Sequence, residues 1–120
     1  MAIDPRAEGW IAQARQVMEG SPPLQPVEGP LHVGVDLGTA YTVLLVLDSS
    51  GKPVGGSYRF AQVVRDGLVV DFIGAVDLLR EMKRQVETRL GRELSEAWTA
   101  YPPGVPQAER RATGNVLVGA

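Results

Sequence analysis

The sequence predicts an α/β fold in which three antiparallel strands precede a long helix and a fourth, parallel strand. Two Val- and Leu-rich runs, 31–36 and 41–47, flank a short turn and are typical of a strand pair. Helical periodicity extends from Asp71 to about Leu90, and an apolar strand at 97–101 follows it. Because strands joined through a helix pair in parallel by a right-handed crossover, we expect 97–101 to lie beside 31–36.

Size and composition restrict the classes of function. A chain of 120 residues has room for one domain with a modest core, and 44% hydrophobic with 22% charged residues is a globular composition. A net charge of -2 with scattered basic residues argues against a nucleic-acid partner. Without cysteine, and with His32 as the one histidine, the chain cannot form a thiolate or histidine zinc site or a catalytic triad. No apolar run is long enough to span a bilayer and no signal-peptide core is present, so we expect a cytoplasmic protein with no membrane partner.

The first thirty residues divide into an amphipathic helical segment, 1–20, and a Pro-rich linker, 21–30. The pair Asp4-Pro5 is typical of a helix start, and Gly20 of a helix end. Two interpretations stay open: the helix docks on a partner groove, or it packs on its own domain or frays. Its apolar positions are Trp10, Ile11, Ala14, Val17 and Met18.

Turns separate the next segments. The sequence Asp-Ser-Ser-Gly at 48–51 predicts a turn, and 52–60 predicts a third strand that completes an antiparallel meander. Pro53, Gly55 and Gly56 in that strand indicate an edge or a bulge. The segment 62–70 contains a second turn, Arg65-Asp66-Gly67, between two short extended arms.

The predicted long helix has clear start and stop signals. Asp71 is suited to the N-cap and Gly91 to the C-terminal stop. On the outer face Asp77 can pair with Arg80, and Glu81 with Arg84. The apolar face comprises Phe72, Val76, Leu79, Met82, Val86 and Leu90.

The strand at 97–101 ends at Pro102-Pro103-Gly104, and helix-forming residues begin at Gln107. The apolar ending at 115–120 leads us to expect a partial lobe, 31–120, of a longer protein. Apolar surface would then be exposed, and the isolated chain would be marginally stable or self-associating. We expect Trp10 and Trp98 to be packing residues rather than platforms for a ligand.

The turn after the first strand carries the candidate chemistry. Asp36 supplies a carboxylate, Thr39 a hydroxyl, and Gly38 permits either a positive φ or a close approach of another group. The amides of Gly38 to Tyr41 can converge on an anion, while the carboxylate holds a hydrated magnesium ion. The alternative is an ordinary hairpin, because Asp, Gly and Thr are common turn residues.

Three segments, in the correct order, resemble the superfamily of actin, sugar kinases and DnaK-type chaperones. The sequence Gly-Val-Asp-Leu-Gly-Thr-Ala at 34–40 resembles its first phosphate motif. The segment 65–72 is similar to the stretch that precedes the first core helix in the bacterial actin MreB, and 97–112 to a chaperone strand that ends in proline and enters a helix. The resemblance implies the first part of a ribonuclease-H-like ATPase lobe.

Within this superfamily, 31–120 is most similar to the EutJ family of ethanolamine utilization proteins, especially at 63–76 and 102–104. The resemblance implies a chaperone-like role with ATP and Mg²⁺ as cofactors. Asp36 would orient water on magnesium as the catalytic and metal-binding residue, and Gly38, Thr39, Ala40 and Tyr41 would bind the phosphates. Implied partners are nucleotide and a protein client, or an enzyme or shell protein of a bacterial microcompartment.

Two features depart from the chaperone pattern. The segment 57–71 is too short for the insertion that carries the chaperones' catalytic lysine, and it contains no lysine; Lys52 and Lys83 are poor substitutes. The second phosphate motif and the adenosine motif would lie beyond Ala120, so we expect no activity from this chain by itself. Two alternatives to an ATPase stay open: an actin-like scaffold or assembly module, and a degenerate relative that binds partners without hydrolysing ATP.

Overall fold

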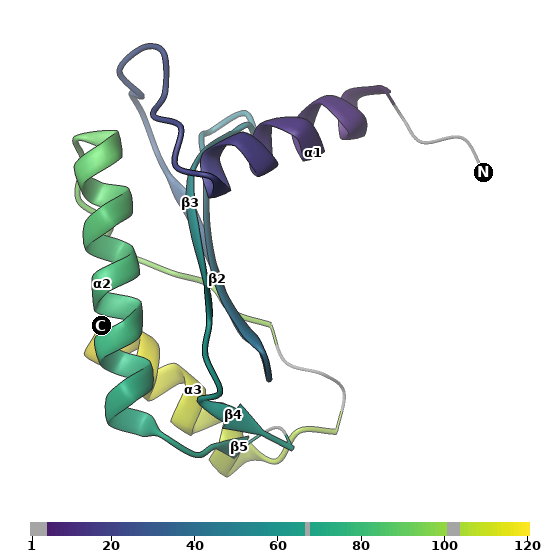
Figure 1. Ribbon diagram of the computed structural model, residues 1–120, viewed down its shortest axis with the longest axis vertical. Coiled ribbons are helices and arrows are strands. Elements are labelled where there is room, and N and C mark those ends of the chain that lie inside the picture. The colour runs from purple at the N-terminus through teal and green to yellow at the C-terminus, as the bar shows by residue number, and fades with distance from the viewer. Residues whose placement is uncertain (1–4, 67, 101–103) are drawn as a thin grey trace.

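A three-stranded antiparallel sheet forms the centre of the molecule (Figure 1). The computed structural model describes residues 5–66, 68–100 and 104–120. Strands β1 (His32–Leu37), β2 (Tyr41–Leu47) and β3 (Pro53–Phe60) pair in that order, with Val35 opposite Leu44. The predicted meander is confirmed.

One face of the sheet and helix α2 (Phe72–Leu90) enclose the core (Figure 1). Alternate residues of β1 and β2 are buried on this face, as the period of two requires. Gly55 permits the close contact between sheet and helix, because a Cβ there would come within 3.0 Å of Val86 Cγ1. The bulge predicted from the glycine-rich third strand appears as a register shift between Val46 and Leu47. The buried core includes Val33, Val35, Leu44, Val46, Leu79, Met82 and Val86.

Helix α2 begins and ends where the sequence predicts. The Asp71 carboxylate accepts a hydrogen bond of 2.9 Å from the Gly74 amide, and Gly91 closes the helix in the left-handed region at φ 67°. The predicted burial of Phe72 is wrong: this first residue of the helix is 45% exposed.

The ion pairs that the spacing on α2 permits do not form in the described structure. Within the described residues, neither Asp77 with Arg80 nor Glu81 with Arg84 forms an ion pair. Arg80 instead donates from Nε to the Gly119 carbonyl, at 3.0 Å, and so ties α2 to helix α3 (Gln107–Gly119). The partner of Arg80 is thus the Gly119 carbonyl at the end of α3 rather than the Asp77 carboxylate.

The predicted parallel strand is present in a shortened form. Trp98 forms an isolated parallel bridge to Gly34, in which Val35 N donates to Trp98 O and Trp98 N to Val33 O, both at 2.8 Å. The parallel direction is therefore confirmed, while the described pairing is one bridge rather than a strand of five residues. The predicted Pro102-Pro103 corner lies outside the described residues.

A second hairpin lies at the end of the sheet where β3 finishes. It consists of β4 (Val64–Arg65) and β5 (Leu68–Val69), as the turn at 65–67 predicted, although Gly67 itself lies outside the described residues. Asp66 occupies the left-handed region at φ 52°. Helix α3 packs against α2 and β5 with Val116 fully buried.

Helix α1 (Pro5–Met18) lies on the side of the sheet opposite α2, with its C-terminal end against β3 (Figure 1). Val17 is buried there, and a Cβ on Gly56 would come within 2.8 Å of Met18 Sδ. Ile11, farther from the sheet, is 55% exposed. Thus the last turn packs on its own domain. The predicted N-cap Asp4 lies outside the described residues, and the packing predicted for Trp10 falls on a side chain that is not described. No described helix combines the length and apolarity that a membrane span requires.

Candidate functional site

The bend between β1 and β2 presents the predicted carboxylate to solvent. Asp36 is the penultimate residue of β1, is exposed, and lies opposite Val43. Its position alternates with that of buried Val35, so its side chain emerges on the face away from α2. The carboxylate is therefore accessible to an ion or ligand.

Gly38 allows the bend to close tightly. Its amide donates a 2.9 Å hydrogen bond to the Tyr41 carbonyl, and a Cβ on Gly38 would lie 2.7 Å from that same oxygen. Its φ is not positive. Of the two roles that the sequence left open for this glycine, the structure selects close approach.

Two amides at the tip of the bend are available to a ligand. Within the described residues, the amides of Thr39 and Ala40 donate to no backbone carbonyl, and Thr39 is exposed. The predicted set of four converging amides is thus reduced, because the Gly38 amide is used inside the turn. The Ala40 carbonyl accepts from the Ala61 amide at 2.8 Å and anchors the tip to the end of β3.

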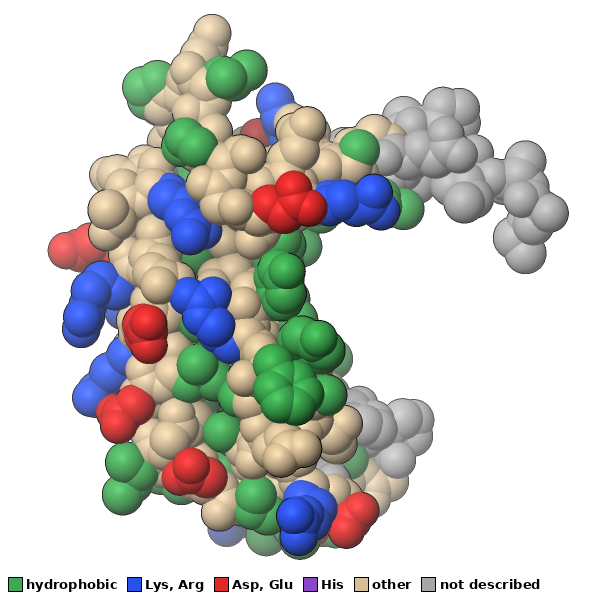
Figure 2. All heavy atoms as spheres, in the orientation of Figure 1, with side chains coloured by type: hydrophobic (Ala, Val, Ile, Leu, Met, Phe, Trp, Pro, Cys, Tyr) green, Lys and Arg blue, Asp and Glu red, His purple; other side chains and the backbone are tan. Residues whose placement is uncertain are grey.

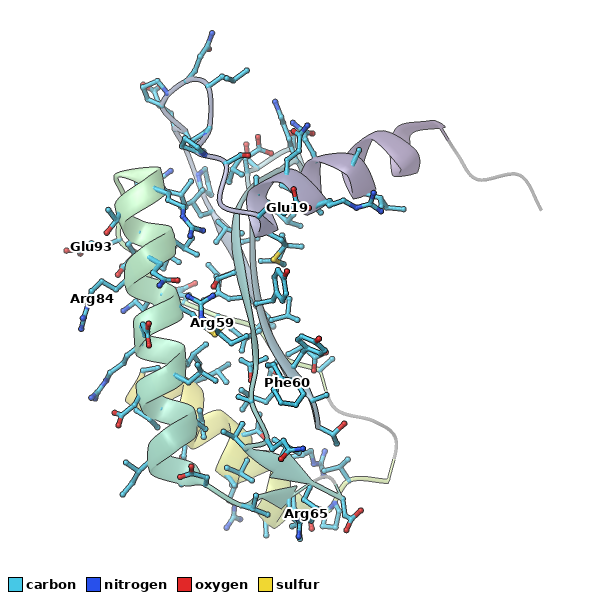
Figure 3. The ribbon with its side chains drawn as sticks, in the orientation of Figure 1. Glu19, Arg59, Phe60, Arg65, Arg84 and Glu93 are labelled. Atoms are coloured by element: carbon cyan, nitrogen blue, oxygen red, sulfur yellow. The ribbon has the colours of Figure 1, made fainter. Side chains whose placement is uncertain are left out.

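Tyr41 belongs to an aromatic cluster beside the bend. Its ring centroid lies 6.1 Å from that of Tyr58 and 5.7 Å from that of Phe60, in tilted and edge-on arrangements. In Figure 3, Phe60 points away from α2, whereas Arg59 points toward α2, where it hydrogen-bonds Gln85. The phosphate contact predicted for Tyr41 stays a prediction.

The face of the sheet away from α2 is apolar and largely uncovered, and in Figure 2 hydrophobic side chains line the concave side of the molecule. A groove of about 660 Å³ on this face runs from Asp36 past Val43 and Leu45 to Trp98. Trp98 is 74% exposed, so the prediction that it is a packing residue is wrong for the described structure. Its bridge to Gly34 directs the indole to the uncovered face.

The β4–β5 hairpin contributes residues whose proximity the sequence did not reveal. Thr39 shares a groove of about 320 Å³ with Gln62, Arg65 and Asp66. Sequence reasoning assigned Arg65 and Asp66 mainly to their own turn. Only the return of the chain along β3 brings the second hairpin beside the first, and no local spacing signals that.

The described residues offer one carboxylate, not a metal cluster, at the bend. No group of three or more His, Cys, Asp or Glu side chains among them is arranged to hold a metal ion. Lys83 lies elsewhere, in a cavity of about 510 Å³ between α2, α3 and the sheet. Lys52 follows the turn at Asp48 and donates its amide to that side chain.

Similarity to known proteins was found in sequence and in structure, although no family model matches the chain. The sequence is 45% identical to ethanolamine utilization protein EutJ of Escherichia coli K12 over 93 residues, which is 78% of this chain and 32% of that protein. It is 44% identical to EutJ of Salmonella typhimurium over 118 residues, which is 98% of this chain and 39% of that protein.

The structural match agrees. A crystal structure of EutJ from Carboxydothermus hydrogenoformans superposes with a TM-score of 0.87 and 43% identity, over 95% of this chain and 42% of that one. This chain is a relative of EutJ. It spans less than half the length of the Escherichia, Salmonella and Carboxydothermus proteins. The α/β fold class, with its antiparallel meander, long helix and parallel bridge, is confirmed.

Proposed function

We propose that this chain supplies the first phosphate-binding turn of a chaperone-like protein that binds ATP and Mg²⁺. The observation that carries the proposal is an exposed carboxylate, Asp36, on the same bend as the Thr39 and Ala40 amides, which have no backbone partner among the described residues. Amides directed at a phosphate are a common means of anion binding. A carboxylate beside them suits the metal ion that accompanies a nucleoside triphosphate.

The residues present fit magnesium better than other metals. Mg²⁺ keeps several waters and is commonly bound by one or two carboxylates together with substrate phosphates. A single carboxylate is what the bend offers, and the described residues contain no larger cluster of metal-ligating side chains. Asp36 would hold the ion through water, and Gly38 would keep the backbone close enough for a phosphate to reach the tip. When bound, the metal would neutralise charge on the phosphates.

The role beyond nucleotide binding follows from the relationship to EutJ. The relatives are named for ethanolamine utilization, and we place this chain in the same process, with a protein client or a microcompartment enzyme or shell protein as partner. In this proposal, nucleotide binding changes the population of conformers that bind the partner. The alternatives are an actin-like scaffold and a partner-binding relative without hydrolysis.

The test uses the protein that carries this chain, with Asp36→Ala and a matched control, Asp77→Ala, which removes an exposed carboxylate from α2. We expect ATP with Mg²⁺ to raise the melting temperature of the wild type and of Asp77→Ala, but not of Asp36→Ala. Equal protection of all three would show that the site is misassigned.

Turnover separates the remaining alternatives. Release of inorganic phosphate from bound ATP supports the ATPase. Bound nucleotide that is never hydrolysed, with nucleotide-dependent sedimentation of the protein, supports the scaffold. Absence of any magnesium-dependent ATP binding supports the degenerate relative.

A further inference from the structure

Two hairpins that are far apart in the sequence meet at one groove. The tip of the β1–β2 bend contributes Thr39, and the β4–β5 hairpin contributes Arg65 and Asp66, with Gln62 between them. The Ala61 amide fixes this arrangement by donating 2.8 Å to the Ala40 carbonyl at the tip. The second hairpin therefore lies beside Thr39 at the tip of the first.

The size of the groove limits what it can accept. At about 320 Å³ it lies at the lower end of the range for small-molecule sites, about 300–1,000 Å³. This space suits a phosphate chain rather than a whole nucleotide. Val64 and Val70 complete the wall and contribute no charge.

Arg65 is the cation of this groove. Its side chain is exposed and, within the described part of the chain, its guanidinium makes no hydrogen bond or ion pair. A guanidinium matches phosphate oxygens with two parallel donors, which an ammonium does not. In Figure 3, Arg65 lies at the β4–β5 hairpin, well away from α2 residues such as Arg84.

Asp66 places an opposing charge in the same groove. A negatively charged ligand that enters here gains attraction from Arg65 and repulsion from Asp66. The two neighbouring residues should therefore affect its affinity in opposite directions, and a ligand bound elsewhere would not show this opposition.

We infer that the β4–β5 hairpin extends the phosphate site on this lobe, with Arg65 binding the terminal phosphates of a ligand held by the Thr39 and Ala40 amides. This inference deepens the proposed function and rests on it. Arg65 is a binding residue that lies outside the recognised motif at 34–40, and Asp66 limits the affinity for anions.

The experiment titrates the protein that carries this chain with inorganic triphosphate and Mg²⁺ while the amide signals of Thr39 and Ala40 are followed by NMR. Arg65→Gln should weaken binding about tenfold, the effect of one charge-assisted contact, and Arg65→Lys should weaken it less. Asparagine tolerates the left-handed backbone at position 66, so Asp66→Asn should remove the repelling charge without strain and strengthen binding about threefold. Arg84→Gln removes a cation of the same type from α2 and should leave the affinity unchanged.

The outcomes separate the two ideas. If the tip amides respond to triphosphate and Arg65→Gln binds like Arg84→Gln, the inference is overturned and the proposed function stands. If the wild-type amides do not respond at all, both the proposed turn and the inference are overturned. Circular dichroism of each variant shows whether the fold is intact, and Asp66→Asn keeps the test informative even if Arg65→Gln unfolds.

Discussion

Replacing Gly38 with alanine tests the geometry of the bend directly. A Cβ at this position would lie 2.7 Å from the Tyr41 carbonyl oxygen, a backbone atom held by the hairpin. The bend must open, and the 2.9 Å hydrogen bond from the Gly38 amide to that oxygen weakens. The same contact therefore governs both the stability of the hairpin and the shape of the tip.

The magnitude follows from three opposing effects. Forcing an extra methyl group into filled space costs about 1–3 kcal/mol, and a lost hydrogen bond about 0.5–1.5 kcal/mol. Restricting the unfolded chain returns about 0.4–1 kcal/mol. We expect Gly38→Ala to lower the free energy of unfolding by about 2 kcal/mol, which is the balance of these effects.

Gly34→Ala is the matched control on the same strand. A Cβ at Gly34 meets nothing within 4 Å, and the φ of this residue is not positive. This change should leave stability unaltered or raise it by up to about 1 kcal/mol. The assay is urea denaturation monitored by circular dichroism at several protein concentrations, so that self-association is detected. Equal midpoints for the two variants would refute the reasoning about the bend.

Three further changes test other parts of the fold. Thr42→Val should stabilise the chain by about 1 kcal/mol, because the Thr42 hydroxyl is buried without a hydrogen-bond partner among the described residues. A lower urea midpoint for the variant than for the wild type would reveal a partner such as a buried water. Asp71→Ala should lower the free energy of unfolding by about 1 kcal/mol, since it removes the acceptor for the Gly74 amide, and an unchanged midpoint would contradict the cap. A hydrogen bond from the Ser50 hydroxyl, together with bonds from backbone amides, holds the pKa of Asp48 below its ordinary value of 3.8. The ionised carboxylate therefore stabilises the fold above pH 3.8, and this stabilisation is lost as the pH falls through the lowered pKa. Asp48→Asn should flatten that acid limb of the stability profile, and an unchanged limb would contradict this assignment.

The candidate site divides into a part that the sequence reveals and a part that it does not. The residues of the first turn are contiguous, so their types alone indicate a carboxylate next to a tight, anion-accessible bend. Arg65 also lies in a recognisable turn, yet nothing in its local spacing connects it with Thr39. That connection depends on the length of β3 and on the hydrogen bond between Ala61 and Ala40, which are consequences of sheet register.

The sequence by itself determined the features that depend on near neighbours. The caps of α2 at Asp71 and Gly91, the order of the three antiparallel strands and the turn at 65–67 follow from propensities and periodicities that act over a few residues. The tertiary structure alone decided which predicted apolar residues are covered and which backbone amides are already used. Phe72 and Trp98 are residue types common in protein cores, but no other described element covers them. The Gly38 amide is already hydrogen-bonded to the Tyr41 carbonyl inside the turn. Burial and hydrogen-bond pairing depend on what the rest of the chain places opposite a residue, and local sequence does not encode that.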